Sequence, residues 1–215
     1  MEQYKKANNS NFVKTIYLRG KEANTFILNV GCGSESFGNI KIDKYRGAAN
    51  IIADIEVGIP FRENVFEIVY SRFLFEHLRN PSFVLDEMVR VLSPGGKLIL
   101  ITDNASYPPF YFIPSLGSGF HVGGYKGKGP EDKHYAIFTK EHVKNHLTYA
   151  GLEDVAANYI YADSVGGKCG VWQRMSKLLK LNEFKLLEPF CKANIFASGI
   201  KPLKKQCIMV KIDSG

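Results

Sequence analysis

The chain has 215 residues, a length that fits one domain of ordinary size. Hydrophobic residues make up 45% and charged residues 23% of the sequence, and these near-average fractions exclude a disordered or fibrous chain. The net charge of +7 comes from scattered lysines that are not interleaved with aromatic residues, so a nucleic-acid partner is disfavoured. No apolar run approaches the roughly 20 residues of a membrane span, and the N-terminus lacks the apolar core of a signal peptide. We therefore expect a cytoplasmic protein.

The first half of the chain alternates short apolar runs with polar turns. Residues 25–30 form an apolar run that ends in glycines, which is typical of a strand buried on both faces of a parallel sheet. A helix is expected to begin at Pro81, because proline suits the first helical turn and apolar residues then recur at helical spacing. Four further strands are expected around this helix, at residues 40–43, 50–54, 66–71 and 97–102.

The second half begins with a segment of different composition. Residues 104–130 are rich in Gly, Pro and Tyr and have no sustained periodicity, so we interpret 104–137 as a lid insert. Thr139 is expected to cap a helix that ends near Gly151. The later elements are expected to be a strand at 154–161, amphipathic helices at 171–193 within a helical insert at 163–204, and a closing strand at 206–212. We expect the apolar stripe of these helices to cover the sheet or to meet a partner subunit, as in a homodimer.

Strands that alternate with helices favour an α/β sandwich with a mostly parallel sheet. Neither an internal repeat nor a linker divides the sequence, so a single domain over residues 1–215 is expected. The cysteines form no CxxC pair and do not cluster with histidines at metal-ligand spacing, which indicates buried reduced thiols and no metal site. They are Cys32, Cys169, Cys191 and Cys207.

A glycine loop, Gly31-Cys32-Gly33, follows the first expected strand directly. Its glycines let the backbone turn tightly and expose amide groups to a ligand across the strand end. Asp43 ends the next expected strand, where its carboxylate can accept hydrogen bonds from both hydroxyls of a ribose. Asp54 ends the third, where it can accept one from an adenine amino group while Ile55 packs on the ring. Each residue alone is an ordinary turn residue, but their order at one sheet edge favours a nucleoside-binding site.

Five motifs in this order resemble the class I S-adenosylmethionine-dependent methyltransferases. The resemblance covers roughly residues 25–103 and rests on the stretches ILNVGCG, IKIDKY, ADIEVGIPF, FEIVYSRFLFEHLRNP and LDEMVRVLSPGGKLIL. It implies a Rossmann-like three-layer sandwich with a seven-stranded, mostly parallel sheet, and S-adenosylmethionine as the cofactor. The residues that it implies at the cofactor are Asn29, Gly31, Cys32, Gly33, Asp43, Lys44, Asp54, Ile55, Ser71, Arg72 and Phe73.

The connection after the glycine loop is unusually short. Only residues 34–39 separate Gly33 from the second expected strand, whereas a parallel crossover commonly needs a dozen residues or more and a helix. We therefore expect a shortened first crossover in which the first helix is vestigial or replaced. Ser36 stands where a dinucleotide fingerprint has its third glycine, and the acidic residue follows too early, which tells against NAD.

The resemblance implies a direct displacement at a sulfonium methyl, for which positioning of donor and acceptor is enough and no protein nucleophile is needed. A hydroxyl acceptor benefits from a general base, and the candidates are His77, His121 and His134, because imidazole titrates near neutral pH. Each has an alternative structural role. His77 can buttress the loop after the fourth strand, while His121 and His134 lie within the lid insert.

By resemblance to compact relatives, we expect a small-molecule acceptor, such as a sugar or a lipid-linked glycan, bound under the lid. The alternatives are an RNA or protein acceptor, and a silent S-adenosylmethionine-binding partner of another enzyme. The stretch 104–110 invites comparison with the Asn/Asp-Pro-Pro motif that some relatives use on amino groups. However, three extra residues separate Asn104 from the prolines, and the stretch follows the fifth strand instead of the fourth, so base amino methylation is disfavoured.

Overall fold

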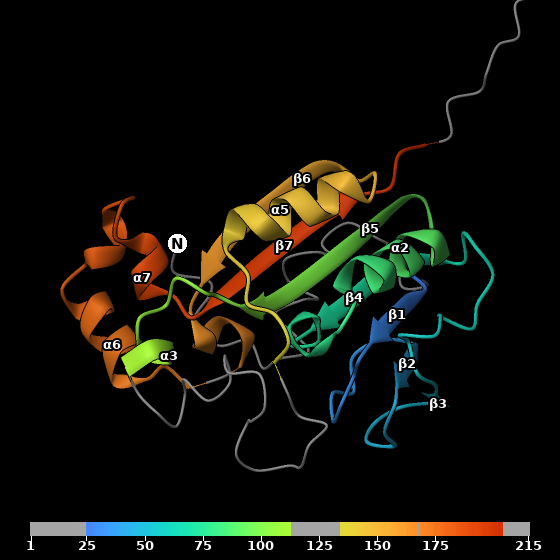
Figure 1. Ribbon diagram of the computed structural model, residues 1–215, viewed down its shortest axis with the longest axis horizontal. Helices are drawn as coiled ribbons and strands as arrows, with labels where there is room; N and C mark the ends of the chain where they lie inside the picture. The colour runs from blue at the N-terminus through green and yellow to red at the C-terminus, as the bar shows by residue number, and fades with distance from the viewer. Residues whose placement is uncertain (1–24, 113–133, 167, 204–215) are drawn as a thin grey trace, which may run out of the picture.

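The computed structural model describes residues 25–112, 134–166 and 168–203, which build a single twisted sheet flanked by helices (Figure 1). The strand order is β3-β2-β1-β4-β5-β7-β6. Strand β7 runs antiparallel to both of its neighbours, whereas the other neighbouring pairs are parallel. The strands are β1 (Ile27–Val30), β2 (Ile40–Asp43), β3 (Ile51–Ile52), β4 (Phe66–Arg72), β5 (Leu92–Asp103), β6 (Glu153–Ile160) and β7 (Asn194–Ile200). The seven-stranded, mostly parallel α/β fold expected from the sequence is confirmed.

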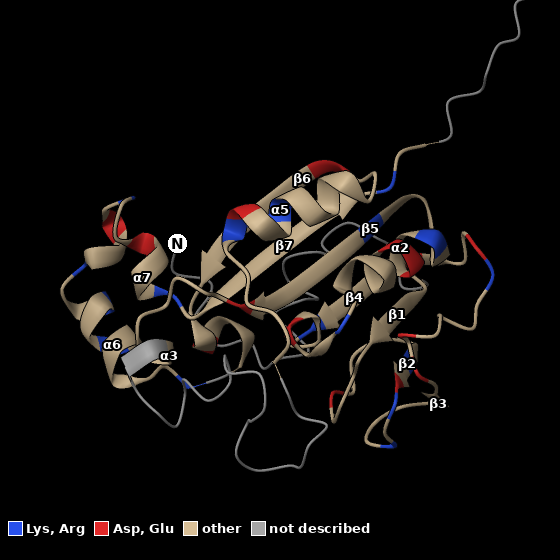
Figure 2. Ribbon diagram, in the orientation of Figure 1, with Lys and Arg blue, Asp and Glu red and all other residues tan. Residues whose placement is uncertain are grey.

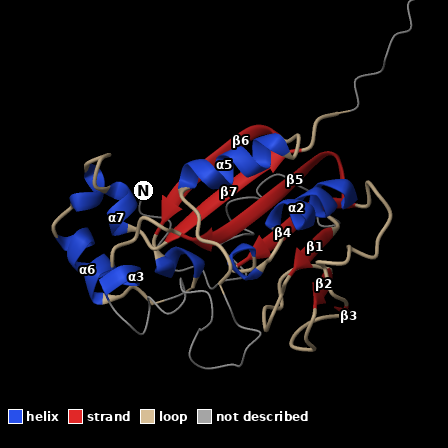
Figure 3. Ribbon diagram, in the orientation of Figure 1, coloured by secondary structure: helices blue, strands red, loops and turns tan. Residues whose placement is uncertain are grey.

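The helices lie on the sheet and beyond its end (Figure 3). Helices α2 (Pro81–Val91) and α5 (Lys140–Tyr149) contact each other and cover the same face of the sheet. The remaining elements are α3 (Pro109–Phe112), α6 (Val171–Leu178), α7 (Glu188–Cys191) and the 3-10 turns η2 (Phe75–His77), η4 (Ala162–Val165) and η5 (Leu181–Glu183). Among the described residues, no helix combines the length and apolar character required to cross a bilayer.

Helix α2 follows closely from its sequence. The side chain of Asn80 accepts a hydrogen bond from the Phe83 amide at 3.1 Å, which caps the helix, and Pro81 takes the first helical position. Its buried side chains, Val84, Leu85, Met88 and Val91, recur at helical spacing and pack on the sheet. Beyond β7, the ammonium group of Lys201 donates to the main-chain oxygens of the last turn, at Val89, Arg90 and Leu92. The helix is therefore fixed at both ends.

No helix fills the connection between β1 and β2, all of which is described. Phe37 lies in this connection, is buried to 4% exposure, and meets the ring of Tyr70 edge-on at 4.9 Å. Together with Val165 of η4, it covers the face of the sheet opposite α2 and α5. A single phenylalanine thus occupies the place of the first helix, and the shortened first crossover is confirmed.

The last strand of the sheet is not the one that the sequence predicts. The predicted strand at 206–212 falls outside the described residues, and the sheet is completed by Asn194–Ile200, inside the helical insert expected at 163–204. This strand is buried between β5 and β6, and its small residues give little hydrophobic signal. Gly199 is required there, because a Cβ would lie 2.9 Å from the Cβ of Leu152.

The helices after η4 do not cover the sheet. Figure 1 shows α6 and α7 grouped with α3 beyond the ends of β6 and β7. Leu178, Leu179 and Phe184 are 82%, 59% and 63% exposed, so most of the expected apolar stripe faces away from the core. In Figure 2 the basic and acidic residues of the described chain are interspersed along helices and loops, as on an ordinary solvated surface.

Candidate functional site

A cavity of ≈ 880 Å³ opens at the carboxyl ends of β1 and β4, where the strand order reverses. Open α/β sheets bind ligands at this position, because the loops leaving the two strands diverge there. The residues that line the cavity are Gly31, Gly33, Asp43, Lys44, Tyr45, Gly47, Asp54, Ile55, Glu56, Phe73, Leu74, His77, Leu78, Arg79 and Tyr135.

The glycine loop and Asp43 form one wall of the cavity. Gly31 and Gly33 have φ angles of +69° and +53°, a region that favours glycine. The Gly33 amide donates to Oδ2 of Asp43 at 2.8 Å, and the Tyr45 amide donates to Oδ1 at 2.9 Å. The carboxylate is held in place while keeping further lone pairs for a ligand, since an ionised carboxylate has about four acceptor sites.

Gly47 is a part of this wall that the sequence interpretation missed. A Cβ at this position would overlap the carbonyl oxygen of Gly33, and the neighbouring Ala48 amide donates to that oxygen at 2.7 Å. The loop after β2 therefore closes directly onto the glycine loop. The only sequence signal for this contact is an isolated glycine four residues after Asp43.

Asp54 lies further along the cavity, beyond β3. Its Oδ1 accepts from the Glu56 amide at 3.1 Å, and its Oδ2 lies 3.2 Å from Nζ of Lys44. Both side chains of this ion pair are substantially exposed, so the pair contributes little stability by itself. Ile55 is buried and also lines the cavity. A carboxylate, an ammonium group and an apolar side chain thus share this end.

At the end of β4, the neighbouring residues Arg72 and Phe73 contact different parts of the protein. Phe73 lines the cavity with a φ angle of 51°, and such strain in a non-glycine residue is concentrated at functional sites. Arg72 instead bonds through Nη1 to the Val165 carbonyl at 2.7 Å and approaches Glu35 at 3.6 Å. Ser71 is fully buried within the strand. Of the residues predicted here, only Phe73 lines the cavity.

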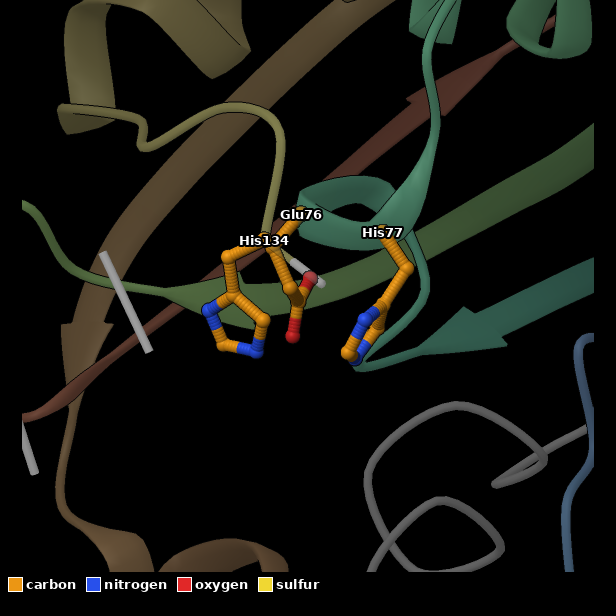
Figure 4. Close-up of side chains that lie close together, drawn as sticks. All are labelled: Glu76, His77 and His134. Atoms are coloured by element: carbon orange, nitrogen blue, oxygen red, sulfur yellow. The ribbon is translucent and has the colours of Figure 1, made fainter. Parts of the chain in front are cut away.

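Glu76, His77 and His134 gather beside the cavity, as Figure 4 shows. One potential ligand atom of each lies within 4.8 Å of the others, and the two imidazole rings are 4.5 Å apart and perpendicular. Glu76 accepts a 2.8 Å hydrogen bond from the Thr102 hydroxyl. Burial, followed by the charge of Asp103, raises the pKa of Glu76 to about 8. A buried acid therefore stands between two histidines at the β4 end of the site.

The comparisons with known proteins agree with this geometry. The profile of the methyltransferase domain family matches residues 36–100. The chain is 36% identical over 76 residues to a demethylmenaquinone methyltransferase of Renibacterium salmoninarum, covering 35% of this chain and 31% of that protein. It is 32% identical over 68 residues to a sterol 4-C-methyltransferase of Caenorhabditis elegans, covering 32% and 20%. The matches thus span less than a third of each relative's length.

Solved structures share the fold over nearly the whole chain. A putative methyltransferase of Haloferax volcanii, solved with the Trm112 methyltransferase activator, has a TM-score of 0.60 at 14% identity, with 92% of this chain and 91% of that chain covered. A methyltransferase of Thermotoga maritima has a TM-score of 0.59 at 14% identity, covering 90% and 87%. The family match at residues 36–100 includes four of the five ordered motifs. The chain thus has the fold of these methyltransferases, and its residues 36–100 match the methyltransferase domain family.

Two predicted cofactor residues of this methyltransferase support the site from behind. Asn29 is fully buried and donates through Nδ2 to the Phe37 carbonyl at 3.0 Å, so it holds the short crossover. Cys32 is 4% exposed, and burial raises the pKa of its thiol, which keeps it protonated. Neither residue is among those that line the cavity.

The lid insert predicted at 104–137 is described only in part. Residues 113–133, which include His121, lie outside the described part of the chain. Asn104 is fully buried and donates through Nδ2 to the carbonyls of Pro189 and Lys192, both at 2.7 Å. Its amide is committed to packing the insert, which agrees with the expectation that the 104–110 stretch is no amino-methylation motif.

Proposed function

We propose that the protein transfers the methyl group of S-adenosylmethionine to an oxygen of a small-molecule acceptor. One observation carries the proposal: a single cavity extends from Asp43 and Asp54 to His77 and Tyr135. A nucleoside-sized end and an end with acid–base groups therefore share one open cavity. Its volume of ≈ 880 Å³ is of the order of small-molecule sites, which span roughly 300–1,000 Å³.

The cofactor end fits S-adenosylmethionine. The carboxylate of Asp43, fixed by two main-chain amides, would accept hydrogen bonds from the ribose hydroxyls. Asp54 would accept one from the adenine amino group, and Ile55 would pack against the ring. Gly31 and Gly33 carry no side chain where the methionine part would pass, which leaves room for close approach of the backbone.

The relatives support a small acceptor more than a polymer. By their names, one acts on demethylmenaquinone and another on a sterol, which are both small molecules. A sugar or glycan is a narrower form of the same proposal, because its hydroxyl groups suit the polar end of the cavity. An RNA or protein acceptor would need an open basic groove, and the interspersed charges in Figure 2 do not favour one.

The chemistry follows from positioning. When bound, the cofactor supplies an electrophilic methyl group on a sulfonium. The acceptor oxygen forms the new C–O bond as the S–C bond breaks, and S-adenosylhomocysteine leaves with the electron pair. The chain contributes alignment of donor and acceptor, and the hydroxyl proton leaves toward His77 and His134, the candidate proton acceptors, with His121 a third candidate.

A calorimetric titration with S-adenosylmethionine, S-adenosylhomocysteine and NAD tests the cofactor. We expect binding of the first two and none of NAD. Asp43→Ala should weaken S-adenosylmethionine binding about 100-fold, because it removes charge-assisted hydrogen bonds worth roughly 1.5–3 kcal/mol each. Asp86→Asn, at an exposed position of α2, is the matched control and should leave binding unchanged. Binding of NAD alone, or full affinity in Asp43→Ala, would overturn the assignment.

A second experiment tests the acceptor class. The protein is incubated with S-adenosylmethionine and small hydroxyl compounds, total RNA or a protein extract, and formation of S-adenosylhomocysteine is measured. Turnover with small molecules supports the proposal, and turnover with only RNA or protein overturns its acceptor. Tight cofactor binding with no turnover in any arm would instead favour a silent binding subunit.

A further inference from the structure

Glu76, His77 and His134 come together although the sequence gives no metal-binding pattern. Glu76 and His77 are neighbours in η2, directly after β4, whereas His134 precedes α5. The two segments are joined by main-chain hydrogen bonds, because the Tyr135 amide donates to the Glu76 carbonyl at 2.7 Å. This bond lies one residue from His134, so it fixes the approach of the three side chains in Figure 4.

We propose that Glu76, His77 and His134 bind a divalent metal ion of the zinc class at the acceptor end of the cavity. The ion's role in methyl transfer rests on the function proposed above, but its binding does not. The donor set is two imidazoles and one carboxylate, which zinc and its transition-metal neighbours prefer, whereas magnesium and calcium prefer oxygen ligands.

The distances permit such a site after small side-chain rotations. The ligand atoms lie within 4.8 Å of one another. Zinc bonds of about 2.0–2.2 Å place tetrahedral ligands roughly 3.5 Å apart, so the three groups must close by about 1 Å. Rotation of the partly exposed His77 is the easiest route, since Glu76 and His134 are 2% and 8% exposed.

The surroundings of the cluster are arranged as around a metal ligand. The hydroxyl of Thr102 donates to Oε2 of Glu76 at 2.8 Å, which orients the carboxylate toward the histidines. Burial of this acid is costly unless a cation or hydrogen bonds compensate it. His77 is the member that lines the cavity, so the open coordination position of the ion would face a bound acceptor.

An ion at this position would change how the acceptor is activated. A hydroxyl oxygen bound to it would lose its proton near neutral pH, since the ion stabilises the resulting anion. The proton would then leave to water instead of to a histidine. Because a histidine that binds the ion through a ring nitrogen is not a free base at that atom, the two roles of His77 and His134 are alternatives that metal binding separates.

Metal binding is tested on the full-length, tag-free protein after removal of metals by a chelator. Zn²⁺ binding is measured by calorimetry, and Co²⁺ is added to a second sample to record its visible absorption. We expect one ion per chain and a Co²⁺ spectrum with nitrogen and oxygen ligands. Glu76→Gln, His77→Gln and His134→Gln should each weaken binding at least about tenfold. Glu153→Gln, an exposed acid on β6, and His142→Gln are the matched controls and should bind as the wild type does.

Circular dichroism and S-adenosylmethionine titration of the same samples separate the possible outcomes. If a buried substitution prevents folding, His77→Gln at the partly exposed position carries the test. No binding by the wild type, or equal binding by wild type and folded variants, would overturn the metal site and leave the histidines as bases. If the wild type binds the metal ion but not S-adenosylmethionine, the proposed function is overturned and the metal site stands.

Discussion

At one end of the cavity, Gly33 from the loop after β1 meets Asp43, the last residue of β2. At the other end, Glu76 and His77 meet His134 from a distant segment. The first end is encoded in one short stretch of sequence. The second exists only after β4, β5 and the segment before α5 have packed. The family match covers residues 36–100, which include Asp43 of the first end and Glu76 and His77 of the second, but neither Gly33 nor His134. The meeting of the two segments at the second end therefore depends on His134, a residue beyond the family match.

The largest expected effect is on the cofactor end. Gly47→Ala should weaken S-adenosylmethionine binding at least about 100-fold, or about 2.7 kcal/mol, because its Cβ would displace the Gly33 carbonyl and with it the amide that holds Asp43. Calorimetry of the folded variant measures this. Gly151→Ala is the control: its φ of +84° strains the backbone by about 1 kcal/mol, but nothing lies within 4 Å, so binding should not change. If Gly47→Ala and the wild type bound S-adenosylmethionine equally, the glycine loop would tolerate the displacement.

The second effect is on stability, through the contacts of Asn104 with the segment before β7. Asn104→Ala should lower the free energy of unfolding by about 2 kcal/mol, because two partly buried carbonyls lose their donor. Denaturation in urea measures the loss, with Asn158→Ala at an exposed position of β6 as the control. Cofactor affinity should stay within about twofold of the wild type. A parallel loss of cofactor binding would show that the two ends are not independent.

A smaller effect is expected from the hydroxyl that orients Glu76. Thr102→Val keeps the shape of the side chain but removes the 2.8 Å hydrogen bond. Zn²⁺ affinity should fall about tenfold, as for other residues that hold a metal ligand in place. Calorimetry with Zn²⁺ and with S-adenosylmethionine on one sample reads the two ends separately. An unchanged Zn²⁺ affinity would mean that packing alone orients the carboxylate.

The smallest effect concerns the connection between β3 and β4, which Glu87 of α2 holds through the Ile59 amide. Glu87 accepts hydrogen bonds from Arg90 and from the Ile59 amide, and the bond to Arg90 lowers the pKa of Glu87. Glu87→Gln should lower the free energy of unfolding by about 1 kcal/mol at pH 7. Because the folded pKa is depressed, this contribution is complete above the ordinary glutamate pKa of about 4.3 and is lost as the pH falls through the folded value. The unfolding temperatures of the wild type and of Glu87→Gln should therefore converge between pH 7 and pH 3. A constant difference between them would contradict the assignment.

The sequence predicts the cofactor end because each of its residues follows a strong local pattern. The apolar run of β1, the glycines after it and the acids that end β2 and β3 are all readable in one short window. The capped start of α2 at Asn80 and Pro81 is equally local. These positions are set by neighbours in the chain, so the fold class and the cavity's location could be predicted without the structure.

The remaining features depend on contacts between distant segments. Strand β7 has a weak apolar pattern because small residues interrupt it, so the sequence predicts the closing strand at 206–212 instead, outside the described residues. Arg72 turns to the Val165 carbonyl, which lies 93 residues away, instead of facing the cavity. The cluster of Glu76, His77 and His134 has no metal-ligand spacing along the chain, and only the folded chain reveals it.

The short crossover held by Phe37 also bears on how the molecule folds. The Ile27 amide bonds to Asn39, twelve residues away, whereas the other neighbour of β1 pairs Leu28 with Val69 across 41 positions. Closing the shorter loop costs about 1 kcal/mol less conformational entropy. Strands β1 and β2 should therefore pair before β4 joins them, so that the carboxylate of Asp43 meets the glycine loop early. Amide-exchange pulse labelling during refolding would then show protection there first. The short connection therefore lets β1 and β2 act as a local folding nucleus. A full crossover helix would lengthen the loop and raise the entropic cost of pairing the two strands.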